Sequence, residues 1–267
     1  MIVQFGFQTL SYAVEHLERS SKRWDARMWL CRVLSFHPNP SPIVERFRKR
    51  LGRCGKQKEI FTHMGPLVIQ AGCNDPYCPR CGWRLRYRET LRSWRKLQEK
   101  VGCVQHSALS FITINGVTKS LGEDFKEDSV SLKEKFKREL RRKLPGVIFT
   151  GHFHIAMTRN GEGKLHLHGW LYHEGYSRKH VREILESAFP DHNQVDVRPS
   201  RCRQNGVFKA FRRGLSYAAD NSFMIRGFGD RSPGVLHDWI HSFLSMRSGG
   251  RKGIRVEYGL MTRKKGG

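Results

Sequence analysis

The stretch Leu165-His166-Leu167-His168-Gly169-Trp170-Leu171-Tyr172-His173 decides how the rest of the chain is interpreted. Two histidines flank one aliphatic residue inside an otherwise apolar run, a pattern that favours a β-strand. Successive side chains of a strand point to opposite faces, so His166 and His168 project from the same face of a sheet. Imidazole binds several divalent metals, which makes the pair a candidate half of a metal site. Taken alone, a His-x-His pair is more often two histidines with ordinary hydrogen bonds.

The segments around this strand predict an α+β fold. Asn160-Gly161 separates two strands, at 147–158 and 164–173, and Asn-Gly between alternating runs is typical of a hairpin. From residue 107 the expected elements follow in the order β-α-β-β-α-β-α. This order fits a largely antiparallel central sheet of the split-βαβ type with helices on one face. The histidine strand would then lie in the middle of the sheet.

Four segments are expected along the chain. A basic helical N-terminal segment comes first, followed by an irregular cysteine-rich module with a basic helix, the α+β core, and a C-terminal helix with a basic tail. Their residue ranges are 1–53, 54–102, 103–230 and 231–267, respectively.

The charge of the chain points to a polyanionic partner. Lys and Arg number 49 against 24 Asp and Glu, which gives a net charge of +25 and a pI near 10.3. Nucleic acid is the leading candidate for a partner of this charge. We expect no membrane partner, because no apolar run approaches the roughly 20 residues needed to span a bilayer. Residues 1–10 lack the basic start of a secretory signal, so we expect a cytoplasmic protein.

The cysteines predict a metal site. Cys73, Cys78 and Cys81 have the spacing C-x4-C-x2-C, and Cys54 stands 19 residues before the first of them. Four thiolate or imidazole ligands in a tetrahedron are typical of structural zinc. We expect these four cysteines to bind Zn²⁺, with His63 as a rival for the fourth place. Free cysteines in a core are the alternative, but the surrounding Pro, Asn, Asp and Gly leave little core to occupy.

A helix at 207–221 carries a tyrosine outside its apolar stripe. With about 100° per residue, Tyr217 falls nearly opposite that stripe, on the side of Arg213. A phenol near a cation has its ionised form favoured, and phenolate is a nucleophile. A partly buried tyrosine that hydrogen bonds to solvent fits the same geometry. The apolar stripe consists of Phe208, Phe211, Leu215 and Ala219.

Together these motifs resemble the HUH endonuclease superfamily, and most closely the replication initiator (Rep) proteins of rolling-circle plasmids. Phe111-Ile112-Thr113-Ile114 resembles the first family motif, His166-Leu167-His168 the histidine motif, and Tyr217 the tyrosine motif that follows it. Cys78-Pro79-Arg80-Cys81-Gly82-Trp83-Arg84 resembles part of a cysteine-rich segment in one Rep group. The resemblance covers roughly residues 54–222. Each motif is short, and their joint order gives the specificity.

The resemblance implies a catalytic Mg²⁺ or Mn²⁺ ion held by His166 and His168. Many members take a third ligand, often a carboxylate, from the neighbouring strand. The corresponding strand here, 151–158, contains no carboxylate. His154 is our candidate, because a suitable register places it opposite His168, and His152 is a weaker one.

The resemblance also implies that Tyr217 attacks the scissile phosphate, which leaves a 5′-phosphotyrosine and a free 3′-OH. The lysine that often follows the family tyrosine is replaced by Asp220 and the residue after it, so Arg212 or Arg213 is expected to substitute. A second tyrosine one turn later is absent, which implies a single-tyrosine mechanism. Asp220 is a candidate general base for a terminating water, or alternatively a solvated carboxylate at a helix end.

The implied substrate is single-stranded or hairpin origin DNA. Arg80 and Arg84 of the cysteine module, with Arg212 and Arg213, are expected to contact it. No G-x-x-x-x-G-K-[ST] loop is present, so a host helicase and a host DNA polymerase would be partners. Three alternatives stay open: a non-catalytic zinc-dependent nucleic-acid-binding protein, a metal-dependent hydrolase without a covalent intermediate, and an HUH-type transposase.

Overall fold

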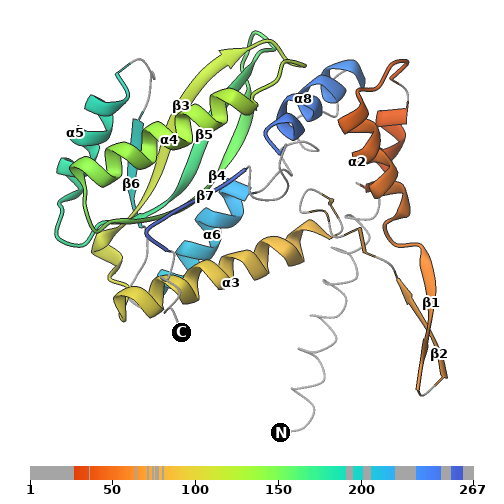
Figure 1. Cartoon of the computed structure of the whole chain (residues 1–267), viewed down its shortest axis with the longest axis horizontal. Helices are drawn as coiled ribbons and strands as arrows, with labels where there is room; N and C mark the ends of the chain where they lie inside the picture. Colours follow the sequence, from red (N-terminus) through yellow and green to blue (C-terminus); the bar gives the residue numbers. More distant parts are fainter. Residues whose placement is uncertain are drawn as a thin grey trace, which may run out of the picture. The chain divides into compact units, whose positions relative to one another are not determined.

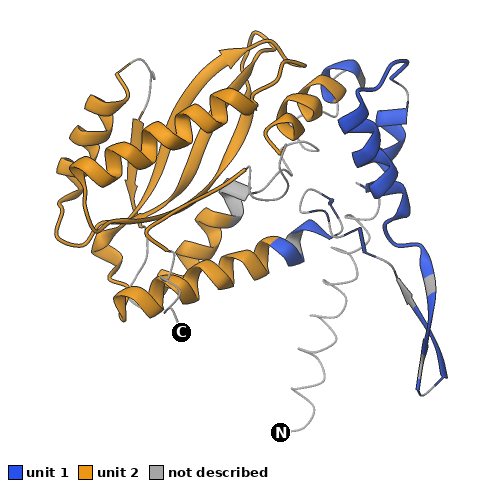
Figure 2. Cartoon of the chain, in the orientation of Figure 1, with its two compact units in different colours: residues 1–85, 221–236 blue, residues 86–220, 237–267 orange. Residues whose placement is uncertain are grey.

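Figure 1 shows the computed structural model of the chain. The chain divides into two compact units, coloured separately in Figure 2: residues 1–85 with 221–236 (unit 1), and residues 86–220 with 237–267 (unit 2). This division is coarser than the four segments that the sequence predicts, and each unit is described by itself. The described residues are 27–35, 37–63, 65–70, 72–73, 75, 78–79, 81–190, 195–200, 206–219, 233–247 and 254–260.

Unit 2 is built on a five-stranded sheet in the order β6-β3-β5-β4-β7, and every neighbouring pair is antiparallel. The predicted α+β class and antiparallel sheet are therefore confirmed, and the histidine strand β5 is the central one. The strand β7 lies where the sequence predicts only a basic tail. The strands are β3 (Leu109–Lys119), β4 (Ile148–Met157), β5 (Gly163–Tyr172), β6 (Val195–Pro199) and β7 (Arg255–Tyr258).

Helices cover both faces of this sheet, so the expectation of helices on one face is wrong. The helices α4 (Lys126–Lys143) and α5 (Arg178–Ala188) lie on the face of Phe149, whose ring meets that of Phe136 edge-on at 4.8 Å. The helices α3 (Gly82–Val101) and α6 (Val207–Ala219) cover the other face. That face carries large apolar residues such as Trp170 beside the histidines, and burying them requires a second layer.

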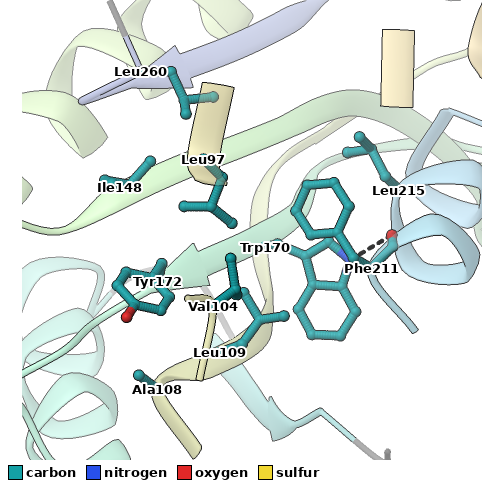
Figure 3. Packing of buried hydrophobic residues seen from close by; sticks show 10 residues of the cluster. All are labelled: Leu97, Val104, Ala108, Leu109, Ile148, Trp170, Tyr172, Phe211, Leu215 and Leu260. Carbon is teal, nitrogen blue, oxygen red and sulfur yellow. Dashed lines mark hydrogen bonds between the residues drawn. The ribbon is translucent and has the colours of Figure 1, made fainter. Parts of the chain in front are cut away.

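The contact between α6 and the sheet is centred on Trp170 (Figure 3). The indole Nε1 donates a hydrogen bond of 2.9 Å to the carbonyl oxygen of Phe211, and the two rings stack at 6.3 Å. Leu215 is buried in the same cluster, as the predicted apolar stripe requires. A Cβ atom on Gly214 would lie 2.6 Å from the indole nitrogen, so only glycine lets α6 approach this closely. Trp170 thereby holds α6 against the face that carries the histidines.

The opposite face of the same two strands contains a pair of glycines. Gly151 lies opposite Gly169 in the register of β4 and β5. A Cβ atom on Gly151 would lie 2.2 Å from the carbonyl oxygen of His168 and 2.5 Å from the ring of Phe149. The absence of side chains at both positions gives the Phe149 ring room to lie across the strands.

The described part of unit 1 contains a helical pair and a hairpin. In α2 (Pro42–Arg53), Phe47 and Leu51 are fully buried, and Arg27 from the helical residues 27–35 donates to the carbonyl oxygen of Leu51 at 2.6 Å. The hairpin consists of β1 (Gln57–Thr62) and β2 (Gly65–Gln70), which form their own two-stranded sheet. The sequence predicts an irregular module here, so the hairpin is a correction.

Among the described residues, the helices are too short or too polar to cross a bilayer. The twenty residues of α3 illustrate this, because arginines and lysines recur along its length.

Just after β5, a buried histidine takes part in a directional chain of hydrogen bonds. Nδ1 of His173 lies 2.9 Å from the carbonyl oxygen of Tyr176, and Nε2 lies 2.8 Å from Oγ of Ser110. Arg178 donates to the same Oγ at 3.2 Å. A carbonyl only accepts, so Nδ1 carries a proton, and in the neutral ring Nε2 accepts from the Ser110 hydroxyl. Burial lowers the pKa of His173, and the charge of Arg178 acts in the same direction.

We therefore expect the free energy of unfolding to fall as the pH drops from about 7 toward about 5. The unfolded chain takes up a proton at His173 below about pH 6.5, whereas the folded chain resists it, so acid favours unfolding. In urea titrations at several pH values, His173→Gln should reduce this slope by up to about 1.4 kcal/mol per pH unit. His63→Gln, in the exposed hairpin turn, is the control. An unchanged slope in His173→Gln would contradict a buried neutral ring.

Candidate functional site

Four imidazoles lie on one face of the β4–β5 hairpin. The register places His154 opposite His166 and His152 opposite His168. Directly opposite residues of an antiparallel pair share a face, and so do residues two apart on one strand. The expected pairing of His154 with His168 is therefore wrong by two residues, although a shift of two keeps the side chain on the same face. Hydrogen bonds between Thr158 and Glu162 close the turn in the observed register.

Three of these rings form a loose triangle. The rings of His166 and His168 are nearly parallel at 5.3 Å, and His154 lies 6.0 Å from His168 and 6.5 Å from His166, between centroids. Nitrogen ligands of one ion, each about 2.1 Å from it, lie about 3 Å apart. Among the described residues, one ring nitrogen from each of the three histidines cannot be chosen so that all three lie within 4.8 Å of one another. The rings are gathered on one face, but they would have to turn inward to share an ion.

The environment of the triangle keeps the rings of His166 and His168 neutral. Burial lowers the pKa of His168 to about 3 and that of His166 to about 4, with a smaller contribution from the neighbouring imidazoles. Nδ1 of His168 lies 2.9 Å from Oγ1 of Thr113 on β3, a bond that fixes the orientation of the ring. Nδ1 of His166 is buried without a hydrogen-bond partner among the described residues. A neutral, oriented imidazole is the form that binds metals.

Charged side chains lie around the fourth imidazole, that of His152. Nε2 of His152 lies 4.0 Å from a carboxylate oxygen of Glu89 on α3. Burial lowers the pKa of His152 to about 3, and the charges of Arg255 and Arg86 act in the same direction. Arg255 in turn donates to Oγ of Ser93 at 2.7 Å. Strand β4 has no carboxylate, and Glu89 of α3 brings one to this face.

Sequence reasoning did not identify Thr113, Asn115 or Glu89 as site residues. Thr113 belongs to a strand motif that the sequence singles out, but its position opposite His168 depends on the β3–β5 register. Asn115 lies opposite His166 and is 3 % exposed, with a buried Oδ1 that has no partner among the described residues. Glu89 has no signal in the sequence, because α3 resembles a basic surface helix.

The tyrosine predicted to be catalytic lies on α6, the helix held against this face by Trp170. Tyr217 follows Gly214 by one helical turn, within the bounds of α6, and its side chain lies outside the described residues. Asp220 lies outside them entirely. On the same helix Arg212 is half-buried and Arg213 is exposed. The structure thus brings the helix, the triangle and these arginines into unit 2.

In unit 1, four thiols form a compact group. The Sγ atoms of Cys54, Cys73, Cys78 and Cys81 all lie within 4.8 Å of one another. Cys54 lies 3.2 Å from Cys81 and 3.6 Å from Cys78. Four sulfurs bound at about 2.3 Å to one ion would lie about 3.8 Å apart, close to this spacing. His63 is not in the group, and Cys54 takes the fourth place.

Helix ends bring two of these cysteines together. Cys54 is the C-cap of α2, and Cys81 immediately precedes the first residue of α3. The thiols of Cys73, Cys78 and Cys81 hydrogen bond to the Cys54 sulfur and lower its pKa, so this position favours a thiolate. The pKa of Cys78 is raised because its thiol donates to Cys54. A cation at the centre would remove this competition and let all four sulfurs ionise.

The predicted basic residues of this module are placed only in part. Arg84 is exposed in the first turn of α3, and Arg80 lies outside the described residues. Nearby, the buried carboxylate of Asp75 pairs with Arg50 at 3.3 Å.

The chain was also compared with known proteins. No family model matches it, and no match was found among the curated proteins or the solved structures that were searched.

We expect the purified chain to hold one metal ion at the four cysteines. Cys78→Ser removes a fully buried ligand. The amount of metal bound after dialysis should fall from about one ion per chain to near zero. Inductively coupled plasma mass spectrometry measures this amount. Because the binding energy of a structural metal contributes to folding, the Tm should fall as well. Cys103→Ser, at an exposed cysteine outside the group, is the control. Equal metal content in the two variants would contradict the site.

Proposed function

We propose that the chain is a single-tyrosine endonuclease of the HUH type, which nicks single-stranded or hairpin DNA at the origin of a rolling-circle plasmid. One arrangement carries the proposal. The His166-Leu167-His168 pair lies on the central strand, His154 lies beside it, and the helix that contains Tyr217 packs against the same face. The net charge of +25 supports a nucleic-acid substrate, because cations release counterions from the phosphate backbone on binding.

The residues that would hold the catalytic ion, Mg²⁺ or Mn²⁺, are His154, His166 and His168. They suit a cation because low pKa values keep His166 and His168 neutral and because Thr113 orients the second of them. When bound, the ion would polarise a phosphoryl oxygen of the DNA. Of the two metals, the nitrogen ligands favour Mn²⁺, since Mg²⁺ prefers oxygen ligands.

The covalent step would be carried by Tyr217. Its phenol oxygen would form a bond to the scissile phosphorus as the bond from phosphorus to the 3′ oxygen breaks. The phenol would give up its proton to solvent or a base, and the departing 3′ oxygen would take up a proton. The products are a 5′-phosphotyrosine and a free 3′-OH, so the phosphodiester energy is conserved for rejoining. The 3′-OH would then prime a host polymerase, with a host helicase unwinding the duplex.

Further residues of α6 and its C-terminal end would assist. Arg212 and Arg213 would supply the positive charge that a lysine after the tyrosine supplies in many relatives. Asp220 would activate the water that releases the strand at termination, as a general base. In unit 1, the four cysteines would hold Zn²⁺ as a structural ion, because four thiolates are a preferred zinc ligand set. Arg80 and Arg84, which lie within three residues of Cys81 in the sequence, would contact the DNA.

We expect Tyr217→Phe to abolish covalent capture of DNA. A pool of single-stranded oligonucleotides labelled at the 3′ end should give a labelled protein band on denaturing gels when Mn²⁺ is added to the wild type. The 3′ label is required because the 5′-phosphotyrosine joins the protein to the downstream fragment. Tyr87→Phe removes a phenol from the exposed side of α3 and should leave the band intact.

The same gel, together with a native mobility-shift gel that reports binding, separates the alternatives. Binding without cleavage by the wild type would favour a non-catalytic nucleic-acid-binding protein. Cleavage without a labelled protein band would favour a hydrolase that uses the histidines alone. A band that persists in Tyr217→Phe would remove that residue from the proposed role.

We expect Thr113→Val to weaken metal binding on the histidine face. The valine keeps the shape of the side chain but removes the hydroxyl that orients His168, a kind of loss that typically costs 10–100-fold in affinity. The Mn²⁺ affinity, followed by electron paramagnetic resonance, and the Mn²⁺ concentration for half-maximal capture should shift together. Thr118→Val, exposed on the same strand, is the control. Equal Mn²⁺ affinity in the two variants would argue against His168 as a ligand.

A further inference from the structure

The β1–β2 hairpin exposes large apolar side chains on both of its faces. Phe61 is 82 % exposed, Val68 59 % and Leu67 50 %. In the register of the two strands, Phe61 pairs with Pro66, Ile60 with Leu67, and Val68 with Glu59. Phe61 and Val68 therefore share one face, and Leu67 lies on the other. Figure 1 shows the hairpin as a twisted ribbon that follows α2 in the chain.

Such a ribbon has no core of its own to bury these side chains. An isolated two-stranded hairpin is marginally stable in water, and contiguous exposed apolar groups usually mark an interaction site. Apolar residues on both faces suit a partner that encloses the ribbon from two sides. A flat partner would cover only one face.

The helix that leads into the hairpin presents a row of cations. Arg46, Lys49, Arg50 and Arg53 are all exposed, at the spacing i, i+3, i+4 and i+7 that defines one side of a helix. The buried Phe47 and Leu51 occupy other positions of α2. We call this row the basic stripe of α2. It spans about 10 Å along the axis, the length of about three phosphates of one DNA strand.

Of these four cations, Lys49 and Arg50 have an acidic partner among the described residues. The one acidic residue of α2, Glu45, pairs with Arg48 at 2.6 Å and more loosely with Lys49 at 3.7 Å. Arg50 pairs with Asp75 at 3.3 Å. The stripe therefore keeps a net positive charge. Two copies of this chain would bring like charges together if they met here, which disfavours a second copy as the occupant.

We propose that this part of unit 1 binds double-stranded DNA, with the basic stripe of α2 on the phosphates and the apolar tip of the hairpin inserted into a groove as a wedge between base steps. The inference rests on the proposed function, which makes origin DNA the partner, and it names duplex beside the nick as the form that unit 1 binds. Apolar wedges of this kind partly unstack bases and bend the duplex. A groove also encloses a ribbon from two sides, as the exposure of Phe61 and Leu67 requires.

The wedge is tested by DNA unwinding. A closed circular plasmid is relaxed by a topoisomerase in the presence of protein that carries Tyr217→Phe, so that the protein itself cannot nick. Partial unstacking should shift the distribution of topoisomers. Adding Phe61→Ser and Leu67→Ser should abolish the shift and weaken binding to a 30-base-pair duplex about tenfold. Val130→Ser, at a 46 % exposed valine on α4, is the matched control and should change neither.

The basic stripe is tested by the salt dependence of binding. Arg46→Gln with Lys49→Gln should reduce the slope of log affinity against log salt by about 1.8, because each lost phosphate contact removes about 0.9. The variant with Phe61→Ser and Leu67→Ser, called the hairpin variant, should leave the slope unchanged, since apolar contacts release no counterions. Arg138→Gln with Arg141→Gln makes the same charge change on α4 and should leave the slope close to that of the wild type.

Two outcomes would overturn the inference. In the first, the hairpin variant binds duplex with full affinity and shifts the topoisomers as much as the protein with Phe61 and Leu67 intact. The metal content of the variant must be unchanged, which shows that unit 1 is folded. The other is a wild-type dimer that becomes a monomer in that variant by light scattering, which would make the tip a contact between copies. The hairpin variant with Tyr217 restored should still form the covalent band on single strands. Hairpin-dependent duplex binding in a wild type that forms no band would support this inference and reject the endonuclease.

Discussion

The antiparallel pairing of β4 with β5 is the constraint on which the rest of unit 2 depends. It places four imidazoles on one face and, on the other, sets Gly151 opposite Gly169 so that the Phe149 ring can lie across both strands. A slip of one residue between the two strands would move His166 and His168 to the Phe149 face, away from His152 and His154, and bring side chains where only glycine fits. The packing of one face therefore enforces the chemistry of the other. Trp170, on the same strand as His168, then holds α6 in place.

The two groups of candidate metal ligands differ in character. The four sulfurs in unit 1 already lie close enough to surround an ion, and two of them are held at helix ends. On β4 and β5, Thr113 orients His168, but the rings of the histidines stand further apart. A closed ligand set is typical of structural ions, whereas an incomplete set leaves positions for substrate or water. The proposed structural role of the cysteines and the proposed chemical role of the histidines rest on this difference.

Local patterns explain what could be predicted from the sequence. The alternation around His166 and His168, the Asn160-Gly161 turn and the order of elements all depend on neighbouring residues, and the structure has the strands and the central position that they predict. Long-range geometry could not be predicted in the same way. The partner of His154 depends on how the turn closes, the cover on the second face depends on Trp170, and Glu89 reaches the site only because α3 packs there. The β1–β2 hairpin was missed because its strands are short and their apolar residues face no core.

The position of the histidines along the chain has a consequence for the order in which the protein is made. All four imidazoles come from residues 152–168, within one local hairpin, whereas α6 begins at Val207 and β7 at Arg255. Hairpins form in microseconds, and a chain leaves the ribosome at about 5–20 residues per second, so local contacts precede later segments. The nascent chain would therefore display its ligand-bearing surface for seconds before Tyr217 has been synthesised. Under the proposed function, metal ions would be able to bind the histidines before the tyrosine proposed as nucleophile has been synthesised.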